Sequence, residues 1–456
     1  MKAIKIQFYF LILISFVFSQ KTFPQALLEK YVEEGISNNI VLKQKQISLD
    51  KAMYALNIAT SYFFPSINLE GNYTSGEGGR NILFPVGDIV NPIYQTLNQL
   101  TQSNRFPLID NVKTNFFPFH YYDIKLRTTM PIINTDLIFG RNIQRGQVVL
   151  QEYEVDVYKR ELIKEIKTAY YNYLSAISSE KIYRDALVVA EEGKRVNESL
   201  VKNGEGLRVY ILRSEGEISE INTRIVEAGN NVQRARRYFN FLLNKDLEEN
   251  IDISYDISLK ISEIDSILAG ENNLLNREEL KMMETGIDIN ESFLSMSKLY
   301  WIPKVSAFID LGVQDQLYNY NSNSRYYLLG LQLSVPIFET FRNRYKIDTA
   351  ELEVKNSQLN LDLTRNQIKL TQSIARSDLL AARQNYYTSI KKLEAAKSYQ
   401  ELIENGYKEG ANTFIETVDA RAQLTHASLM LNINTTKVLA ALANYERETA
   451  NEKIDY

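Results

Sequence analysis

Residues 303–314 read PKVSAFIDLGVQ, and their side chains alternate between apolar and polar or small with a period of two. Phe308 is the one exception to this alternation. Successive side chains of an extended strand point to opposite faces, so the stretch predicts a strand of about ten residues with one apolar and one polar face. This pattern is typical of outer-membrane barrel strands, although a strand of a soluble sandwich shows the same alternation.

Three further stretches alternate in the same way, over residues 67–73, 122–130 and 329–335. Aromatic side chains flank the predicted strands at both ends: Tyr62, Phe63, Phe64, Tyr300 and Trp301 at one end, and Phe116, Phe117, Phe119, Tyr121, Tyr326 and Tyr327 at the other. The two interfaces of a membrane favour aromatic side chains. The flanks therefore favour membrane strands over ordinary aromatic packing.

The N-terminus has the pattern of an export signal. Lys2 and Lys5 precede an apolar run from Phe8 to Phe18, and Ser19 fits the position before a cleavage site. This run is too short to span a bilayer, which requires about 20 residues. We expect residues 1–19 to be a signal peptide and the exported chain to have no membrane-spanning helix.

The composition disfavours most enzyme classes. The chain has 456 residues, with 52 Lys and Arg, 56 Asp and Glu, a net charge of −4, two His and no Cys. Nucleic-acid-binding domains carry a basic excess, which this chain lacks. The absence of Cys excludes disulfide scaffolds, zinc ribbons and thiol catalysis, and two His disfavour a histidine-rich metal site. We expect no catalytic residues, no cofactor, no metal and no nucleic-acid partner.

Long helices are predicted where proline is absent. Residues 132–302 and 337–456 contain no proline, and apolar side chains recur there at spacings of three and four. Such stripes indicate helices that form a bundle or a coiled coil. Glycine-containing breaks at residues 203–206 and 409–412 interrupt them.

The chain reads as an internal duplication. Residues 62–67, YFFPSI, align with residues 300–305, YWIPKV. The number of residues between Pro131 and Gly204 is also nearly the same as that between Pro336 and Gly410. The predicted organisation is a signal peptide (1–19), a first repeat (20–270) with a strand hairpin at about 62–130, and a second repeat (271–456) with a hairpin at about 300–335. Residues 74–116, which contain Pro85, Pro92 and Pro107, are expected to form a long loop between the first two strands, and the glycine run at residues 76–79 within it is expected to be flexible surface.

Four motifs resemble the TolC-like outer-membrane efflux family, the outer membrane factors. They are the aromatic-x-Pro-x-hydrophobic pattern at Pro65 and Pro303, VPIF at 335–338, NREEL at 276–280, and YKEG at 407–410 followed by ETVDARAQL at 416–424. The resemblance covers essentially the whole exported chain. It implies a homotrimer with a 12-stranded β-barrel, four strands per chain, continued by a long α-helical coiled-coil barrel into the periplasm. Four strands alone cannot close a barrel, so oligomerisation is expected on physical grounds too.

The resemblance implies a passive exit duct in the bacterial outer membrane. Such a duct works with a periplasmic adaptor protein and an inner-membrane pump in a tripartite efflux or type I secretion system. The alternative is a trimeric coiled-coil adhesin or a structural envelope protein. Adhesins usually place one set of strands at the C-terminus, whereas this chain has two internal hairpins and ends on a predicted helix.

The candidate functional residues lie around the two glycine breaks. These breaks are predicted to be helix–turn–helix tips that face the adaptor, through Gly204, Gly206, Leu207, Gly410, Ala411, Asn412 and Thr413. Beyond the second break, Glu416 and Asp419 are three residues apart and share one helix face. In the family, carboxylates at these positions line the narrowest constriction, so they are the candidate gate. Arg208, Tyr210 and Arg213 are the candidates to hold that gate closed. The alternative for Glu416 and Asp419 is an ordinary solvated helix face.

Overall fold

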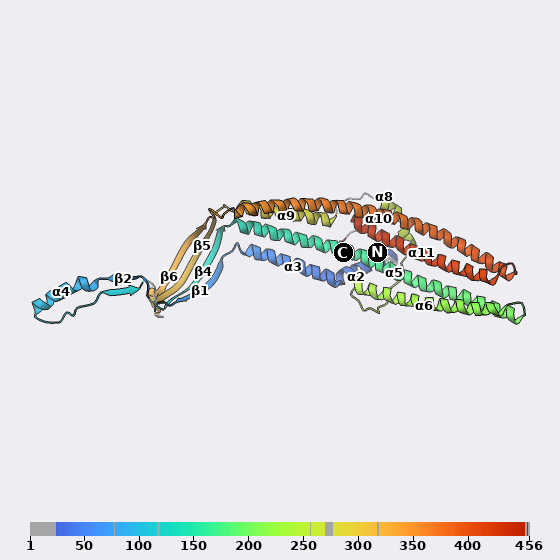
Figure 1. Cartoon of the computed structure of the whole chain (residues 1–456), viewed down its shortest axis with the longest axis horizontal. Coiled ribbons are helices and arrows are strands. Elements are labelled where there is room, and N and C mark those ends of the chain that lie inside the picture. The colour runs from blue at the N-terminus through green and yellow to red at the C-terminus, as the bar shows by residue number, and fades with distance from the viewer. Residues whose placement is uncertain are drawn as a thin grey trace, which may run out of the picture. The chain divides into compact units, whose positions relative to one another are not determined.

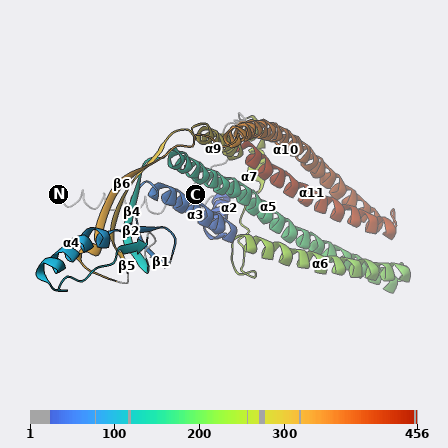
Figure 2. The ribbon, with the colours of Figure 1, turned by 60° about the vertical axis from the view of Figure 1, so that its left-hand side comes forward.

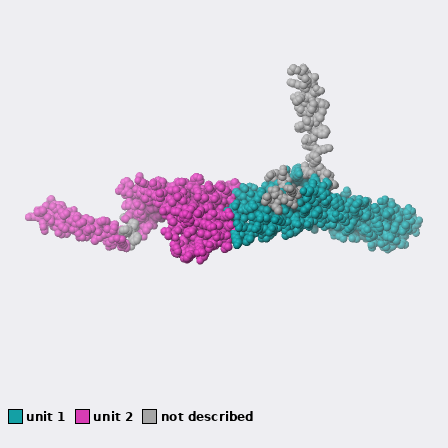
Figure 3. Space-filling view, turned by 90° about the horizontal axis from the view of Figure 1, so that it is seen from above, with its two compact units in different colours: residues 1–52, 147–288, 355–456 teal, residues 53–146, 289–354 magenta. Residues whose placement is uncertain are grey.

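The computed structural model describes residues 24–76, 78–115, 119–255, 257–269, 277–316, 319–451 and 454. The predicted signal peptide, the flanking aromatics Phe116 and Phe117, and the first residue of the NREEL motif lie outside these residues. The chain forms two compact units, one made of residues 1–52, 147–288 and 355–456, the other of residues 53–146 and 289–354 (Figure 3).

The second unit is built on a four-stranded antiparallel sheet. The four alternating stretches form its strands, β1 (Ser66–Thr74), β4 (Tyr121–Ile133), β5 (Lys304–Gln316) and β6 (Arg325–Ser334), in the order β1-β4-β5-β6 (Figure 1). Leu69 pairs with Leu126, which in turn pairs with Leu311. β1 and β6 are the two edges, so this sheet does not close on itself.

Phe308, the exception to the alternation in β5, is explained by its cross-strand partner. It pairs with Gly330 on β6, and a Cβ at Gly330 would lie 2.6 Å from the Phe308 ring. The Arg127 guanidinium lies 5.2 Å from the centre of the same ring. An aromatic side chain on the polar face thus covers a glycine and supports a neighbouring cation.

Residues 78–115, which belong to the predicted long loop, contain regular structure. β2 (Asn81–Phe84) and β3 (Val112–Asn115) pair antiparallel, and α4 (Val86–Thr101) lies between them in the chain. Pro85 precedes the helix, and Pro92 lies inside it. The three prolines therefore do not prevent a helix here, because other residues fix it, as described below.

Long helices make up most of the remaining chain, as the absence of proline predicted. Two of them, α5 (Thr135–Lys202) and α10 (Arg342–Lys408), turn back into α6 (Arg208–Leu242) and α11 (Phe414–Thr449), which lie beside them in both ribbon views (Figures 1 and 2). The shorter elements are α2 (Pro24–Asn38), α3 (Ile40–Ser61), α7 (Ile257–Ser262), α8 (Ile264–Ala269), α9 (Glu278–Lys298) and the 3-10 turn η2 (Ser322–Ser324). None of the helices in the described residues combines the length and apolar character needed to cross a membrane.

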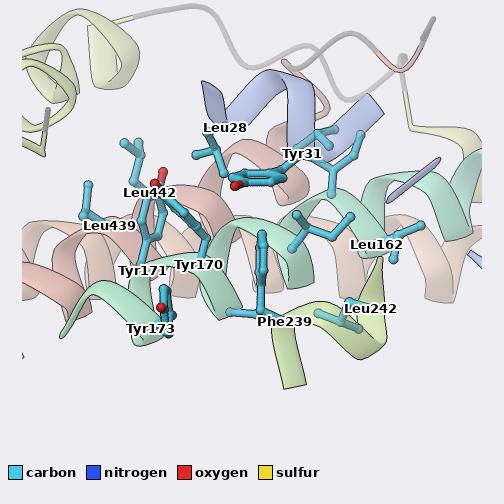
Figure 4. Close-up of a cluster of buried hydrophobic side chains, with 14 of the residues drawn as sticks. Leu28, Tyr31, Leu162, Tyr170, Tyr171, Tyr173, Phe239, Leu242, Leu439 and Leu442 are labelled. Carbon is cyan, nitrogen blue, oxygen red and sulfur yellow. The ribbon is translucent and has the colours of Figure 1, made fainter. Parts of the chain in front are cut away.

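The core of the first unit is rich in tyrosine (Figure 4). Tyr31 of α2 meets Phe239 of α6 edge to face at 5.1 Å, and Tyr170 of α5 lies 5.5 Å from Phe239. The buried Tyr170 hydroxyl donates to the Asp252 carbonyl at 2.9 Å. A tyrosine ring buries apolar surface while its hydroxyl forms a hydrogen bond to an acceptor. A chain with 29 Tyr and one Trp can therefore build a core from tyrosine.

A buried ion-pair network joins the start of α9 to the end of α11. Arg277 is only 2% exposed, and its Nη1 donates to the Glu448 carboxylate at 2.9 Å and to the Glu448 carbonyl at 2.6 Å. Arg277 also pairs with Glu279, and Arg447 pairs with Glu448 at 2.7 Å. Arg277 belongs to the NREEL motif, so this motif has a structural role here.

Candidate functional site at the helix tips

Both glycine breaks are tight turns between antiparallel helices. Gly204 and Gly410 have φ of +80° and +75°, a left-handed conformation that side chains with a Cβ adopt at a cost. The amide of Glu205 donates to the Leu200 carbonyl at 2.9 Å, and the amide of Ala411 donates to the Gly406 carbonyl at 2.7 Å. The two turns therefore satisfy the last carbonyls of α5 and α10 in the same way.

The other predicted tip residues line these turns. Gly206 donates its amide to the Leu200 carbonyl at 3.0 Å, and Leu207 is the N-cap residue of α6, with its side chain 58% exposed. Asn412 donates its amide to the Gly406 carbonyl at 3.1 Å, and Thr413 is the N-cap residue of α11. An exposed leucine at a turn gives the first tip an apolar contact point.

Glu416 closes a capping box with Thr413. Its carboxylate accepts the Thr413 amide at 2.6 Å, while its own amide donates to the Thr413 hydroxyl at 3.4 Å. The hydrogen bond from the Thr413 amide, together with those from the Asn412 amide group and the Thr413 hydroxyl, holds the pKa of the Glu416 carboxyl below its usual value. Glu416 thus has a local structural partner that the gate prediction did not include.

Asp419 lies one turn further along α11 and is exposed, as is Glu416. Its carboxylate accepts a hydrogen bond from the Gln423 amide group, on the same helix, at 2.7 Å. Two carboxylates therefore lie on the surface of α11 within the first two turns.

The three gate-holding candidates differ in their surroundings. Arg208 and Arg213 are exposed, and among the described residues of this chain neither pairs with Glu416 or Asp419. Tyr210 instead packs on Phe414, with 5.2 Å between the ring centres.

A buried hydrogen-bond chain that the sequence did not reveal joins the two tips. The Tyr407 hydroxyl donates to the Asn197 side-chain oxygen at 2.8 Å, and the Asn197 amide donates to the Ser214 hydroxyl at 3.1 Å. Asn197 is 1% exposed, and Ser214 is fully buried. These two hydrogen bonds connect α10, α5 and α6. These three residues lie between the apolar stripes of their helices, and no sequence motif predicts that they meet.

An ion pair makes the second connection. Arg421 of α11 donates to the Glu217 carboxylate of α6 through Nε at 3.1 Å and Nη2 at 2.9 Å. Its side chain crosses α5 at Gly193, where a Cβ would lie 2.6 Å from the Arg421 Nη1. The guanidinium also lies 5.7 Å from the centre of the Phe414 ring. Arg421 is therefore the central polar contact between the two tips within one chain.

A groove of about 720 Å³ runs beside this ion pair, over α5, α6 and α11. Its lining includes Arg213, Glu217, Glu220, Arg224 and Arg421, together with apolar side chains such as Leu212 and Val418. Arg213, predicted to hold the gate, thus faces a mixed charged and apolar groove. Among the described residues, no three His, Asp or Glu side chains cluster where they could hold a metal ion.

The chain has the same fold as several solved outer-membrane channels. The model of the outer membrane efflux protein family matches residues 270–447. The solved outer-membrane channel OprN has a TM-score of 0.73 to this chain at 16% identity, covering 94% of this chain and 90% of OprN. No curated protein matches the sequence.

Two further channels give similar values. The Campylobacter jejuni CmeC outer membrane channel has a TM-score of 0.71 at 15% identity, with 94% of this chain and 87% of CmeC covered. The open state of the Neisseria gonorrhoeae MtrE outer membrane channel has a TM-score of 0.72 at 14% identity, with 93% and 88% covered. These findings confirm the resemblance to the TolC-like outer-membrane efflux family. The matched family model and these channels, all of outer-membrane proteins, agree with the predicted location in the outer membrane and periplasm.

Proposed function

We propose that the protein is the outer-membrane exit duct of a tripartite efflux or type I secretion system. It assembles as a homotrimer and passively conducts substrates that a periplasmic adaptor and an inner-membrane pump deliver. The observation that carries this proposal is the uncovered apolar face of the sheet. Leu69, Leu331 and Leu329 are 72%, 72% and 68% exposed within one chain. Outer-membrane lipid is the partner that such a face fits.

The opposite face of the sheet supports the same proposal. There Arg127 pairs with Asp310 through two hydrogen bonds of 2.8 Å, and the Tyr326 hydroxyl donates to Asp123 at 2.7 Å. A polar inner wall and an apolar outer wall are what a water-filled barrel requires. With two unpaired edges, β1 and β6, three copies would close a 12-stranded barrel edge to edge.

The helices also have a face for neighbouring copies. Leu359, Leu363, Leu370 and Ile374 of α10 form an exposed apolar stripe with spacings of four, seven and four. The buried residues of the same helix, such as Ile368 and Leu379, lie on the other side. A helix with two apolar faces has one for its own chain and one for a partner, which favours a coiled-coil barrel of several chains.

The tips serve two roles in this proposal. The turn residues Gly204, Gly206, Leu207, Gly410, Ala411, Asn412 and Thr413 face the adaptor. Beside them, Glu416 and Asp419 from three chains form a ring of six carboxylates that attracts cations and narrows the duct. Arg208, Tyr210 and Arg213 stabilise the closed arrangement, and adaptor binding opens it by offering replacement contacts.

The adhesin alternative accounts for fewer of these features. A structural spacer needs long helices, but it needs neither a charged strand face nor paired helix tips with carboxylates beside them. Both features suit a wall around a conduit.

Conductance in planar bilayers tests the proposal. Purified protein is expected to form discrete cation-selective channels that trivalent cations block. The double variant Glu416→Ala, Asp419→Ala is expected to lose selectivity and block, whereas the control Glu394→Ala, which removes an exposed acid of α10, retains both. A wild-type protein that forms no channels would contradict the duct. Unchanged selectivity and block in the double variant would remove these two residues from the gate.

A further inference from the structure

The segment between β1 and β4 contains a helix that is locked to its own chain by side-chain amides. Asn91 of α4 donates to the Ile109 carbonyl and accepts the Ile109 amide, both at 2.9 Å. Two turns further along the same face of α4, Asn98 makes the same two bonds with Phe106, at 2.7 and 3.1 Å. Each asparagine side chain thus donates one hydrogen bond to a backbone carbonyl and accepts one from the amide of the same residue. The two asparagines together hold residues 106–109 alongside the helix.

The start of α4 is fixed by the same segment. The Asp88 amide donates to the Asn111 side-chain oxygen at 3.1 Å, and the Asn111 amide group donates to the Asp88 carboxylate at 2.9 Å. Gly87 permits this approach, because a Cβ there would lie 2.4 Å from the Ile109 carbonyl oxygen. These contacts hold α4 in one orientation relative to residues 106–111. They also define which face of α4 points away from that segment.

That outward face is apolar and uncovered. Val86, Ile89, Ile93 and Leu100, which we call the α4 stripe, are 37%, 65%, 56% and 77% exposed. Their spacings of three, four and seven place them on one side of the helix. Burying large aliphatic side chains is worth about 1.5–3 kcal/mol each, so an uncovered stripe of four marks a contact surface.

The residue types of the stripe indicate what covers it. In heptad notation Val86 and Ile93 occupy a positions and Ile89 a d position, and β-branched residues at both positions favour assemblies of three or more helices over dimers. Thr96, at the following d position, already donates its hydroxyl to the Pro92 carbonyl at 2.8 Å. The stripe therefore fits identical helices around a three-fold axis.

Charge argues in the same direction. Asp88 is the only charged residue of α4, and it is bound to Asn111. Helices that lie on a membrane surface usually carry Lys or Arg on their polar face, which α4 lacks. With one charged residue per helix, which already accepts a hydrogen bond from Asn111, like-charge repulsion between copies is small. A second copy of this chain thus fits the stripe better than a lipid surface does.

We propose that α4 is a self-association surface through which three copies of the chain pack stripe against stripe. This rests on the proposed homotrimer, which brings three such helices to the same end of one barrel. A helix of this length is about 24 Å long and would not associate strongly alone. Tethering to one barrel raises the local concentration to the millimolar range, where weak packing is sufficient.

Cysteine cross-linking tests the surface, because the chain has no cysteine of its own. Ile93→Cys and Leu100→Cys place a thiol in the stripe, and Gln95→Cys places one on the opposite, exposed side of α4. After mild oxidation of intact cells, both stripe variants are expected to form disulfide-linked dimers at several times the yield of Gln95→Cys. Equal yields for stripe and control positions would overturn the proposal.

The mass of the same variants in detergent separates the two claims. A three-chain assembly without stripe cross-links would overturn the α4 proposal and leave the duct intact, whereas a single-chain mass would contradict the homotrimer itself. An environment-sensitive fluorophore attached to the Ile93→Cys variant tests whether lipid covers the α4 stripe. Quenching of that fluorophore by brominated lipid would identify the membrane as the occupant and overturn self-association.

Discussion

Arg421 and Glu217 form a two-point ion pair between α11 and α6, with N–O distances of 2.9 and 3.1 Å. Their side chains are 9% and 14% exposed, so the pair is largely shielded from water. Removing one partner of a buried ion pair costs about 3–5 kcal/mol, because the other charge is left without compensation. The pair is therefore a strong constraint on the relative position of the two tips.

We expect Arg421→Ala to loosen the closed tips. The variant should show a higher conductance in planar bilayers and a lower unfolding temperature than the unmodified protein. Arg365→Ala is the matched control: Arg365 pairs with Asp362 at 2.9 Å, but the two side chains are 41% and 66% exposed. Such surface pairs contribute about 0–1 kcal/mol, so the control should change neither quantity appreciably. Equal conductance for both variants would remove the ion pair from gating.

The turn at Gly410 should tolerate asparagine and reject valine. Its φ of +75° is accessible to Asn but costs a β-branched residue about 1–2 kcal/mol, although a Cβ would meet no atom within 4 Å. Gly410→Val should therefore distort the tip and reduce export of a reporter substrate, while the amount of assembled protein stays unchanged. Export at the normal level in Gly410→Val, measured beside Gly410→Asn, would count against a docking role for this turn.

Acid should weaken the link between α9 and α11. Burial alone would raise the pKa of the Glu448 carboxyl, but the hydrogen bond from Arg277 and the charges of Arg447 and Arg277 hold it below its usual value. A carboxyl with a lowered pKa stabilises the fold above its unfolded pKa of about 4.5, and this stabilisation is lost as the pH falls through the folded-state pKa. Unfolding temperatures should therefore drop below about pH 4.5.

The variant Glu448→Gln separates this site from the rest of the acid response. It should unfold at a lower temperature at pH 7, because Arg277 loses a buried partner, and its unfolding temperature should depend less steeply on pH in the acid range. A pH profile parallel to that of the unmodified protein would show that Glu448 does not titrate with folding.

The lipid-facing side of β6 gives a matched pair of substitutions. Leu331→Arg places a charge on the exposed apolar face, at a cost of about 2–4 kcal/mol near the bilayer midplane. Gln332→Arg places the same charge on the polar face, where Gln332 pairs with Ser306. Assembled protein in outer-membrane fractions should fall for the first variant and change little for the second. Equal loss for the two would contradict the assignment of faces.

The sequence predicted the strands well because each face of the sheet has its own chemistry. Apart from Phe308, the stretch at residues 303–314 alternates, and it forms β5 over Lys304–Gln316. Even its exception, Phe308, follows from a partner, Gly330, that only the pairing of β5 with β6 reveals. Local patterns therefore place elements, while the reason for a deviation lies across the sheet.

α4 shows why part of the fold could not be read from the sequence. A helix start is usually recognised by a Ser, Thr, Asp or Asn at the N-cap, but here Pro85 is at the N-cap and the cap comes from Asn111. The reverse holds at the second tip. Thr413 and Glu416 form a capping-box pattern in the sequence itself, whereas the predictions for Glu416 are a gate or a solvated helix face.

The contacts between the tips belong to the same category. The buried Asn197 and Ser214 and the half-buried Tyr407 lie on three helices, and no periodicity brings them together. Gly193 lies within a helix, and it is explained by the Arg421 side chain, which passes too close to this position to leave room for a Cβ. Such contacts depend on how two helical hairpins pack, which single-sequence patterns do not encode.

The number of chains in the assembly tests the central claim most directly. Light scattering of the purified protein in detergent, corrected for bound detergent, gives the protein mass of the particle. We expect a mass of three chains, since one chain contributes four strands with two open edges and an uncovered apolar face. A stable particle with the mass of a single chain would contradict it.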